Sequence, residues 1–140
     1  MINILNKSFF LFIFFVFTQL NVHAQAKDTG KTSLHPRLVK LKLDSTTYQS
    51  IFEGAPQTVS MHSGLVILKP DETVGDHNTD DYEEMLIILS GEGQMMFTKG
   101  KTFNLKYGEV AYCPPHTEHD VKNTGSALLK YLYIVAKTTQ

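Results

Sequence analysis

Residues 77–93, HNTDDYEEMLIILSGEG, join a polar cluster to an apolar run that ends in a glycine turn. The polar part holds one histidine and four carboxylates within eight residues. It can be half of a metal site or a solvated turn ahead of a strand. The apolar part is short, which favours a strand over a helix. The chemistry of this protein therefore depends on which reading of the polar cluster is correct.

Short apolar stretches separated by turn residues continue through the rest of the chain. Examples are TVSMHSGLVIL (58–68), KYGEVAYCPP (106–115) and SALLKYLYIVA (126–136). Apolar residues also alternate with lysines in LVKLKL (38–43), which predicts a strand soon after Pro36. Turns are expected at SGEG (90–93) and at TKGKT (98–102). Many short strands and no clean helical period predict an all-β barrel or sandwich.

The N-terminus has the pattern of a secretory signal peptide. Lys7 precedes the apolar run FFLFIFFVFTQL (9–20), and VHA stands before Gln25. We predict a signal peptide at residues 1–24, a flexible arm at 25–36 and a single domain at 37–140. The protein is therefore expected to be exported, either to a periplasm or to the outside medium. No basic stop-transfer cluster follows the apolar run, so stable membrane insertion after cleavage is not expected.

Charge and cysteine content narrow the classes of partner. The whole chain has 13 Lys+Arg and 14 Asp+Glu, and removal of Lys7 with the signal leaves 12 against 14, a formal charge of −2. This balance disfavours a nucleic-acid partner and an anionic membrane surface. With Cys113 as the one cysteine, the chain cannot form an internal disulfide. We expect Cys113 to be a small buried residue of a strand.

A second informative stretch is YCPPHTEHDVKN, residues 112–123. If TEHDVKN is a strand, His119, Val121 and Asn123 share one face, and an inward Val121 directs His119 into the barrel. His119 is then either a core histidine with a hydrogen-bond partner or a metal ligand. Together with His77 and Glu84 it could supply three ligands to a divalent metal and leave positions for substrate, water or dioxygen.

These two stretches resemble the paired motifs of the cupins, G-x5-H-x-H-x3–4-E-x6-G and G-x5-P-x-G-x2-H-x3-N. His77 stands at the first histidine, and six residues separate Glu84 from Gly91. Pro114 follows Gly108 after five residues, and three residues separate His119 from Asn123. The resemblance implies a single-domain cupin-type double-stranded β-helix, a jelly-roll barrel. It also implies a divalent metal ion (Fe, Mn, Ni or Zn), a small-molecule organic ligand and a homodimer.

The chain departs from both motifs. Thr79 stands where the first motif has its second histidine, and threonine is a poor ligand for a divalent metal. His116 stands where the second motif has glycine, and it can either replace the missing ligand or face solvent at its turn. Glu83 competes with Glu84, which we prefer for its distance to Gly91, since alternation sends the two to opposite faces.

Four further positions have two interpretations each. His62 either projects into the barrel or lies at an edge or on the surface. Tyr112 either lines a pocket or packs in the core. Asp80 and Asp81 are expected in a solvated turn rather than in the site.

Three functional hypotheses follow. The first is a metal-dependent oxygenase or isomerase whose ion is held by His77, Glu84 and His119. The second is a non-catalytic barrel that binds a sugar or another small metabolite with a degenerate metal site, which the loss of the second histidine favours. The third is a structural role through self-association, which is compatible with either of the others.

Overall fold

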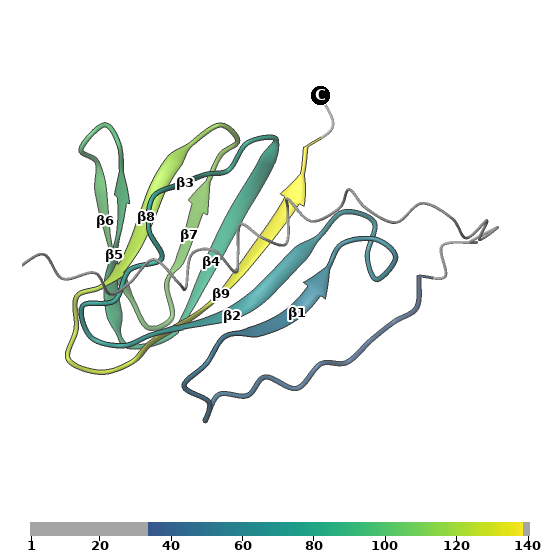
Figure 1. Cartoon of the computed structure of the whole chain (residues 1–140), viewed down its shortest axis with the longest axis horizontal. Helices are drawn as coiled ribbons and strands as arrows, with labels where there is room; N and C mark the ends of the chain where they lie inside the picture. The colour runs from purple at the N-terminus through teal and green to yellow at the C-terminus, as the bar shows by residue number, and fades with distance from the viewer. Residues whose placement is uncertain (1–33, 139–140) are drawn as a thin grey trace, which may run out of the picture. The chain divides into compact units, whose positions relative to one another are not determined.

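The computed structural model describes residues 34–138, so the predicted signal peptide and most of the predicted arm lie outside the described residues. In this part of the chain there are nine strands (Figure 1). No helix in residues 34–138 is long and apolar enough to span a bilayer. The strands are β1 (Gln49–Glu53), β2 (His62–Leu68), β3 (His77–Asn78), β4 (Tyr82–Ser90), β5 (Glu92–Phe97), β6 (Thr102–Lys106), β7 (Val110–Cys113), β8 (Glu118–Asn123) and β9 (Leu129–Lys137).

The strands form two antiparallel sheets, which confirms the all-β prediction. One sheet has five strands in the order β1-β2-β9-β4-β7, and the other has four in the order β3-β8-β5-β6. The chain passes from one sheet to the other after β2, after β3, after β4, after β6, after β7 and after β8. Figure 1 shows the two sheets facing each other, with β8 and β5 in one and β4 and β9 in the other.

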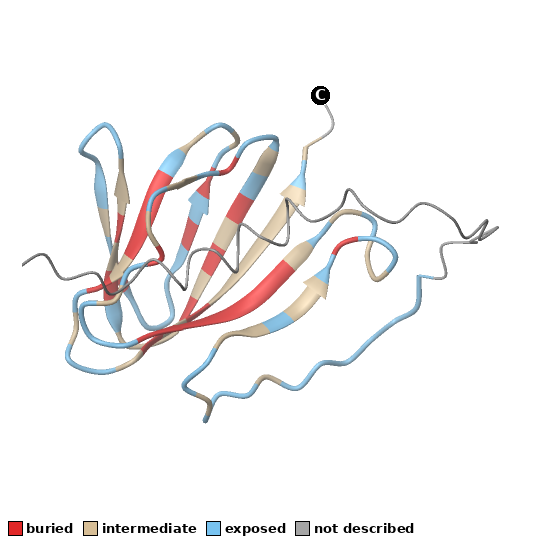
Figure 2. Cartoon of the chain, viewed as in Figure 1, coloured by how far each residue is buried: buried red, intermediate tan, exposed pale blue. Residues whose placement is uncertain are grey.

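The core lies between the sheets because alternate residues of each strand point inward. On the five-stranded sheet, Leu86 and Ile88 of β4 share a face with Tyr131 and Val66, as the strand registers show. From the other sheet Met95 and Val121 are fully or almost fully buried. Figure 2 shows the buried residues along β2, β4 and β8. The two expected turns are also present, with Gly91 and Gly100 at φ of +77° and +81°.

The strand predicted in residues 38–43 is wrong. Residues 38–42 have no regular secondary structure and Leu43 lies in a turn; the segment pairs with no strand in the described part of the chain, and the first strand begins at Gln49. Its backbone is tied instead to a side chain: Lys42 N donates to Gln49 Oε1 at 2.8 Å, and Gln49 Nε2 donates to Lys40 O at 3.1 Å. Leu38 is fully exposed. Alternation alone therefore did not produce a strand, because a strand also needs a neighbour for its backbone.

Asn123, the last residue of the second motif, holds a loop at the opposite end of β8 from His119. It is fully buried, and its Nδ2 donates to Leu68 O at 2.9 Å and to Ala127 O at 2.8 Å. Its Oδ1 accepts a hydrogen bond from Gly125 N at 2.9 Å. The motif asparagine therefore has a structural role in joining the ends of β2 and β8 to the loop before β9.

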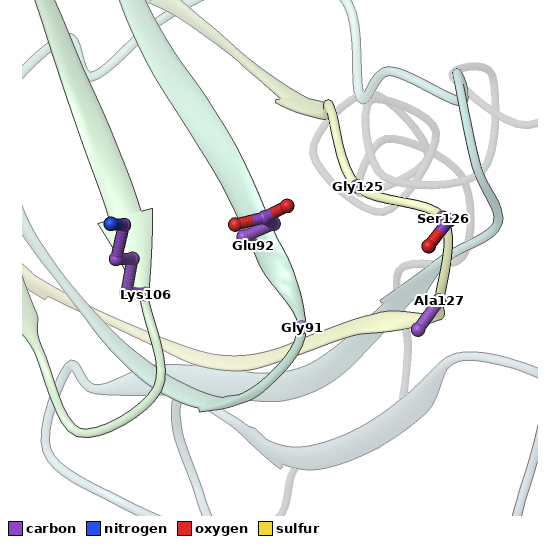
Figure 3. A pocket seen from close by; sticks show the side chains of 6 residues that line it. All are labelled: Gly91, Glu92, Lys106, Gly125, Ser126 and Ala127. Carbon is purple, nitrogen blue, oxygen red and sulfur yellow. The ribbon is translucent and has the colours of Figure 1, made fainter.

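A surface hollow of about 280 Å³ lies at this same end of the fold (Figure 3). Gly91 lies seven positions after Glu84, which corresponds to about 23 Å along a strand. The hollow is therefore remote from the predicted metal ligands. Its lining residues are Gly91, Glu92, Lys106, Gly125, Ser126 and Ala127.

Candidate metal centre

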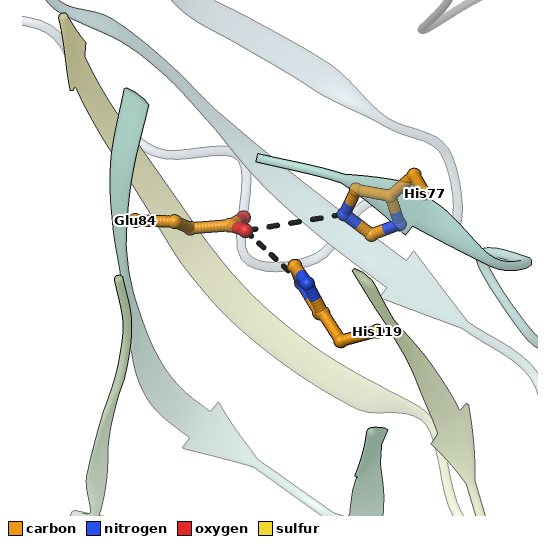
Figure 4. Close-up of side chains that lie close together, drawn as sticks. All are labelled: His77, Glu84 and His119. Atoms are coloured by element: carbon orange, nitrogen blue, oxygen red, sulfur yellow. Dashed lines mark ion pairs between the residues drawn. The ribbon is translucent and has the colours of Figure 1, made fainter. Parts of the chain in front are cut away.

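The three predicted metal ligands come from three strands and meet between the sheets (Figure 4). His77 of β3 pairs in register with His119 of β8, so both imidazoles project from neighbouring strands of the four-stranded sheet. Glu84 projects toward them from β4 of the facing sheet. Their ligand atoms all lie within 4.8 Å of one another. Residues separated by up to 42 positions in sequence thus form one cluster.

The polar contacts within the cluster leave one buried nitrogen unsatisfied. Glu84 Oε2 lies 3.1 Å from His119 Nε2 and 3.9 Å from His77 Nε2. His119 Nε2 is buried and, although this carboxylate oxygen is close to it, makes no hydrogen bond with any described residue. Two imidazole nitrogens and a carboxylate oxygen that converge in this way fit a divalent cation.

Contacts on the far sides of the imidazoles orient them toward this point. His77 Nδ1 lies 3.0 Å from Gly75 O, an arrangement in which Nδ1 donates and Nε2 is left to bind a metal. His119 Nδ1 lies 3.4 Å from Thr117 O and 3.4 Å from Cys113 Sγ. Each imidazole therefore presents Nε2 toward Glu84.

The loop before His77 is fixed by Asp120, the outward neighbour of His119. Gly75 N donates to Asp120 Oδ1 at 2.7 Å, and Thr73 Oγ1 donates to Asp120 Oδ2. Strand β8 thus supplies one candidate ligand and also supports the loop that positions another. The sequence interpretation missed this role of Asp120, since its partners lie 45 and 47 positions away.

Electrostatics favour an ionised carboxylate in the cluster. Burial by itself would raise the pKa of Glu84, but its polar contacts with His119 and His77 lower it below the ordinary value. For His77, burial lowers the pKa, but Glu84 and the Gly75 carbonyl outweigh this effect and raise it. Burial and the Glu84 charge raise the pKa of Cys113 to about 12, so its thiol is neutral at pH 7.

Three alternative site residues face away from the cluster. The His116 side chain is 73% exposed, and its Nε2 lies 3.8 Å from Asp81 Oδ1, so it faces solvent rather than replacing the missing ligand. Glu83 is exposed and accepts a hydrogen bond from Tyr112 Oη at 3.3 Å. Tyr112 is 55% exposed, so it neither lines the cluster nor packs in the core.

Thr79 and His62 are nearer to the cluster. Thr79 is buried, but its hydroxyl is engaged in hydrogen bonds with the turn that follows β7. His62 lies on the inner face of the five-stranded sheet, because it pairs with Val135, which in turn pairs with Glu84. Two strand spacings, about 10 Å, separate the backbones of His62 and Glu84. His62 therefore faces the same interior without joining the cluster.

Comparisons with known proteins agree with this fold. Relatives include the Uncharacterized protein MJ1618 of Methanocaldococcus jannaschii, 33% identical over 85 residues. They also include the Oxalate-binding protein of Thermotoga maritima, 32% identical over 68 residues. These matches cover 61% and 49% of this chain, and they span 64% and 55% of the relatives' own lengths.

Solved structures share the double-stranded β-helix. The cupin domain of Schizosaccharomyces pombe Cnp3 has a TM-score of 0.63 at 21% identity, covering 73% of this chain and 71% of that one. An RmlC-like cupin protein of Methanocaldococcus jannaschii has a TM-score of 0.61 at 20% identity, covering 73% of this chain and 91% of that one. At 20–21% sequence identity, these similarities show a shared fold and nothing further.

The family model described as "Cupin domain" matches residues 64–135, which is 72 of the 140 residues. This match contains His77, Glu84 and His119 and all strands from β3 to β8. The chain therefore belongs to the cupin family.

Proposed function

We propose that this is an exported cupin-domain protein in which His77, Glu84 and His119 hold a divalent metal ion that binds a small organic ligand. The observation that carries the proposal is the buried Nε2 of His119, which lies beside a carboxylate but has no hydrogen-bond partner among the described residues. An unsatisfied polar atom of this kind costs stability unless something binds it. Iron, manganese, nickel and zinc all accept two imidazoles and a carboxylate.

The residues of this chain would hold and balance the ion in specific ways. Glu84 contributes one negative charge, and its lowered pKa keeps that charge at neutral pH. Gly75 O and Thr117 O contact the Nδ1 atoms and so leave both Nε2 atoms for the ion. A divalent ion bound here would supply a Lewis acid to an organic ligand. We propose an oxygenase or isomerase reaction for this site.

The interior face of the five-stranded sheet also carries His62. Its ring lies edge-on to Tyr82, with the ring centroids 6.2 Å apart. Burial lowers the pKa of His62, against the opposing effect of Glu53. We therefore assign His62 to the wall of the interior and not to the set of metal ligands.

The second candidate function is binding without chemistry. A relative is named an oxalate-binding protein, and Thr79 leaves this chain with fewer ligands than the cupin motif. A sugar or another small metabolite would then be held by a weaker metal site. Loaded protein that binds a ligand but neither consumes dioxygen nor alters the ligand would favour this function.

Metal content tests the proposal directly. We expect the purified protein to carry about one divalent ion per chain, measured by inductively coupled plasma mass spectrometry, and the double variant His77→Ala, His119→Ala to carry none. Glu84→Gln should lose most of the metal, whereas the matched control Glu83→Gln should keep it, because Glu83 is exposed and faces away. A folded protein that binds no added Fe, Mn, Ni or Zn would refute the metal site.

Export is tested separately on the expressed full-length chain. We expect N-terminal sequencing of the mature protein to begin at Gln25, and fractionation to find it outside the cytoplasm. Protein that retains Met1 and stays with the cytoplasmic fraction would contradict export without affecting the metal site.

A further inference from the structure

Thr79 is engaged by a single turn of the chain. Its Oγ1 donates to Pro114 O at 2.8 Å and accepts from Thr117 N at 2.9 Å, and its backbone N donates to Thr117 O at 3.2 Å. The residue is buried. Its hydroxyl thus acts as donor and as acceptor at once, and both partners belong to the turn between β7 and β8. Rotation of the hydroxyl toward any other group would take this partner from both the Pro114 carbonyl and the Thr117 N–H, and both hydrogen bonds are partly buried.

Both ends of this contact lie next to a candidate ligand in the sequence. Thr79 lies two residues after His77, and Thr117 lies two residues before His119. A further hydrogen bond joins the turn after β3 to the turn between β7 and β8: His116 N donates to Asp80 O at 2.8 Å. Asp80 and His116 both have positive φ, 49° and 56°, a conformation that residues other than glycine rarely adopt. We call residues 79–81 and 114–117 together the clasp.

We propose that Thr79 is a positioning residue whose hydroxyl closes the clasp and so sets the spacing of His77 and His119, in place of acting as a metal ligand. This inference rests on the proposed metal site. It explains why a threonine at the position of the second motif histidine is compatible with a functional centre. In place of a third ligand, the chain has a hydroxyl that supports the two remaining histidines.

Because Thr79 is engaged in the clasp, the site has fewer protein ligands than the cupin motif would give. Two imidazoles and one carboxylate would hold the ion through three protein atoms, the ligand set of the 2-His-1-carboxylate sites. The other positions of the ion would then be available to water or to a small ligand with oxygen donors.

Three substitutions at one position test the inference. Thr79→Ser keeps the hydroxyl, Thr79→Val keeps the shape without the hydroxyl, and Thr79→His restores the motif residue. We expect metal-free T79V and T79H to melt about 5 °C or more below the wild type, because each leaves Pro114 O and Thr117 N unsatisfied. Metal-free T79S should melt close to the wild type.

Affinity and coordination are measured on the same proteins with Co²⁺ or Zn²⁺ as the probe. T79V should bind the metal roughly tenfold or more weakly although residue 79 does not touch it, as for other groups that orient ligands, and T79S should restore the affinity. X-ray absorption should count two imidazoles in the wild type.

Each other outcome is decisive. A T79V protein that melts lower but binds metal as tightly as the wild type would reduce Thr79 to a purely structural residue. A T79H protein with unchanged melting temperature and a third imidazole on the metal would show that the position is a vacated ligand and overturn the inference. A wild type that binds no metal would refute the proposed function, and the melting temperatures of the metal-free variants would then decide the clasp by themselves.

Discussion

At the scale of single residues, Glu84 is the centre of the candidate site. Its carboxylate is buried between two imidazoles on the facing sheet. Removing a carboxylate from water is costly, and the polar contacts offset that cost only when at least one imidazole is protonated or a cation is bound. In the metal-free protein the charge state of His77 therefore contributes to the stability of the fold.

This predicts a pH dependence for the metal-free protein. The raised pKa of His77 gives stability that is fully present below its ordinary pKa of 6.5 and is lost as the pH rises through the raised value. The lowered pKa of Glu84 gives stability that is present above 4.5 and is lost as the pH falls toward about 2. We therefore expect the pair to stabilise the metal-free protein most between about pH 4.5 and 6.5.

Urea unfolding of metal-free protein at pH 5.5 and pH 8.5 measures this effect. The wild type should lose more free energy of unfolding between these two pH values than Glu84→Gln, which lacks the carboxylate. The other titrating groups are common to both proteins and cancel in the comparison. An identical loss in the two proteins would show that the His77 and Glu84 pair does not titrate as described.

At the scale of elements, β3 and β4 show how the site depends on its surroundings. Strand β3 has only two residues, and it brings His77 into the site because it pairs with β8 and because Gly75 is held by Asp120. Strand β4 carries Glu84 near its start and ends at the turn of Gly91, where the chain crosses to the other sheet. This crossing is tight because a Cβ on Gly91 would lie 2.5 Å from Leu128 O.

Two glycine substitutions distinguish the energetic cost of a positive φ from the cost of this close contact with Leu128. Gly91 and Gly100 have nearly the same positive φ, but a Cβ on Gly100 would meet nothing within 4 Å. We expect Gly100→Ala to cost about 1 kcal/mol of unfolding free energy, the cost of the left-handed conformation. Gly91→Ala should cost roughly 3 kcal/mol or more, since the backbone of residues 128–129 must move as well. Equal losses in urea unfolding would contradict the close packing.

At the scale of the whole molecule, the five-stranded sheet is apolar on both faces. Its outward positions include Met85 and Ile87 of β4 and Leu132 and Ile134 of β9, all half-buried. The edge strand β7 adds Val110 and Tyr112, which are 60% and 55% exposed. A sheet face of this kind is normally covered by another layer. We propose that a second copy of this chain covers it.

The exposed part of this face lies on β9, β4 and β7, because the outward residues of β2, Ser63, Leu65 and Ile67, are buried. Three strands about 4.8 Å apart and at most roughly 20 Å long present on the order of 300 Å², against the roughly 800 Å² that each partner buries in a stable complex. A dimer interface must therefore include further residues, and the segment before β1 has exposed apolar side chains. These are Leu34, Leu38, Val39 and Leu43.

Sedimentation velocity of the mature protein tests the dimer. We expect a dimer at micromolar concentration, and we expect Val110→Asp to convert it to a monomer by placing a charge on the covered face. Val59→Asp is the matched control, since Val59 is 78% exposed and lies in the loop between β1 and β2. A wild type that remains monomeric at about a hundred times this concentration would refute the interface.

The sequence alone was sufficient for the class of fold and for the three candidate ligands. The strand pattern, the turns at Gly91 and Gly100 and the motif spacings of His77, Glu84 and His119 are all local or nearly local signals. The choice of Glu84 over Glu83 also needed only alternation and the distance to Gly91. Each of these depends on which way a side chain points along a strand, which a period of two encodes directly.

Only the tertiary structure decided what the other residues do. The alternating segment 38–43 is not a strand because no described strand lies beside it, and His116 faces solvent because its turn directs it outward. The hydroxyl of Thr79 meets partners 35 and 38 positions away, and Asp120 meets partners 45 and 47 positions away. Hydrogen-bond partners of this kind are set by the packing of distant strands, and local periodicity carries no information about them.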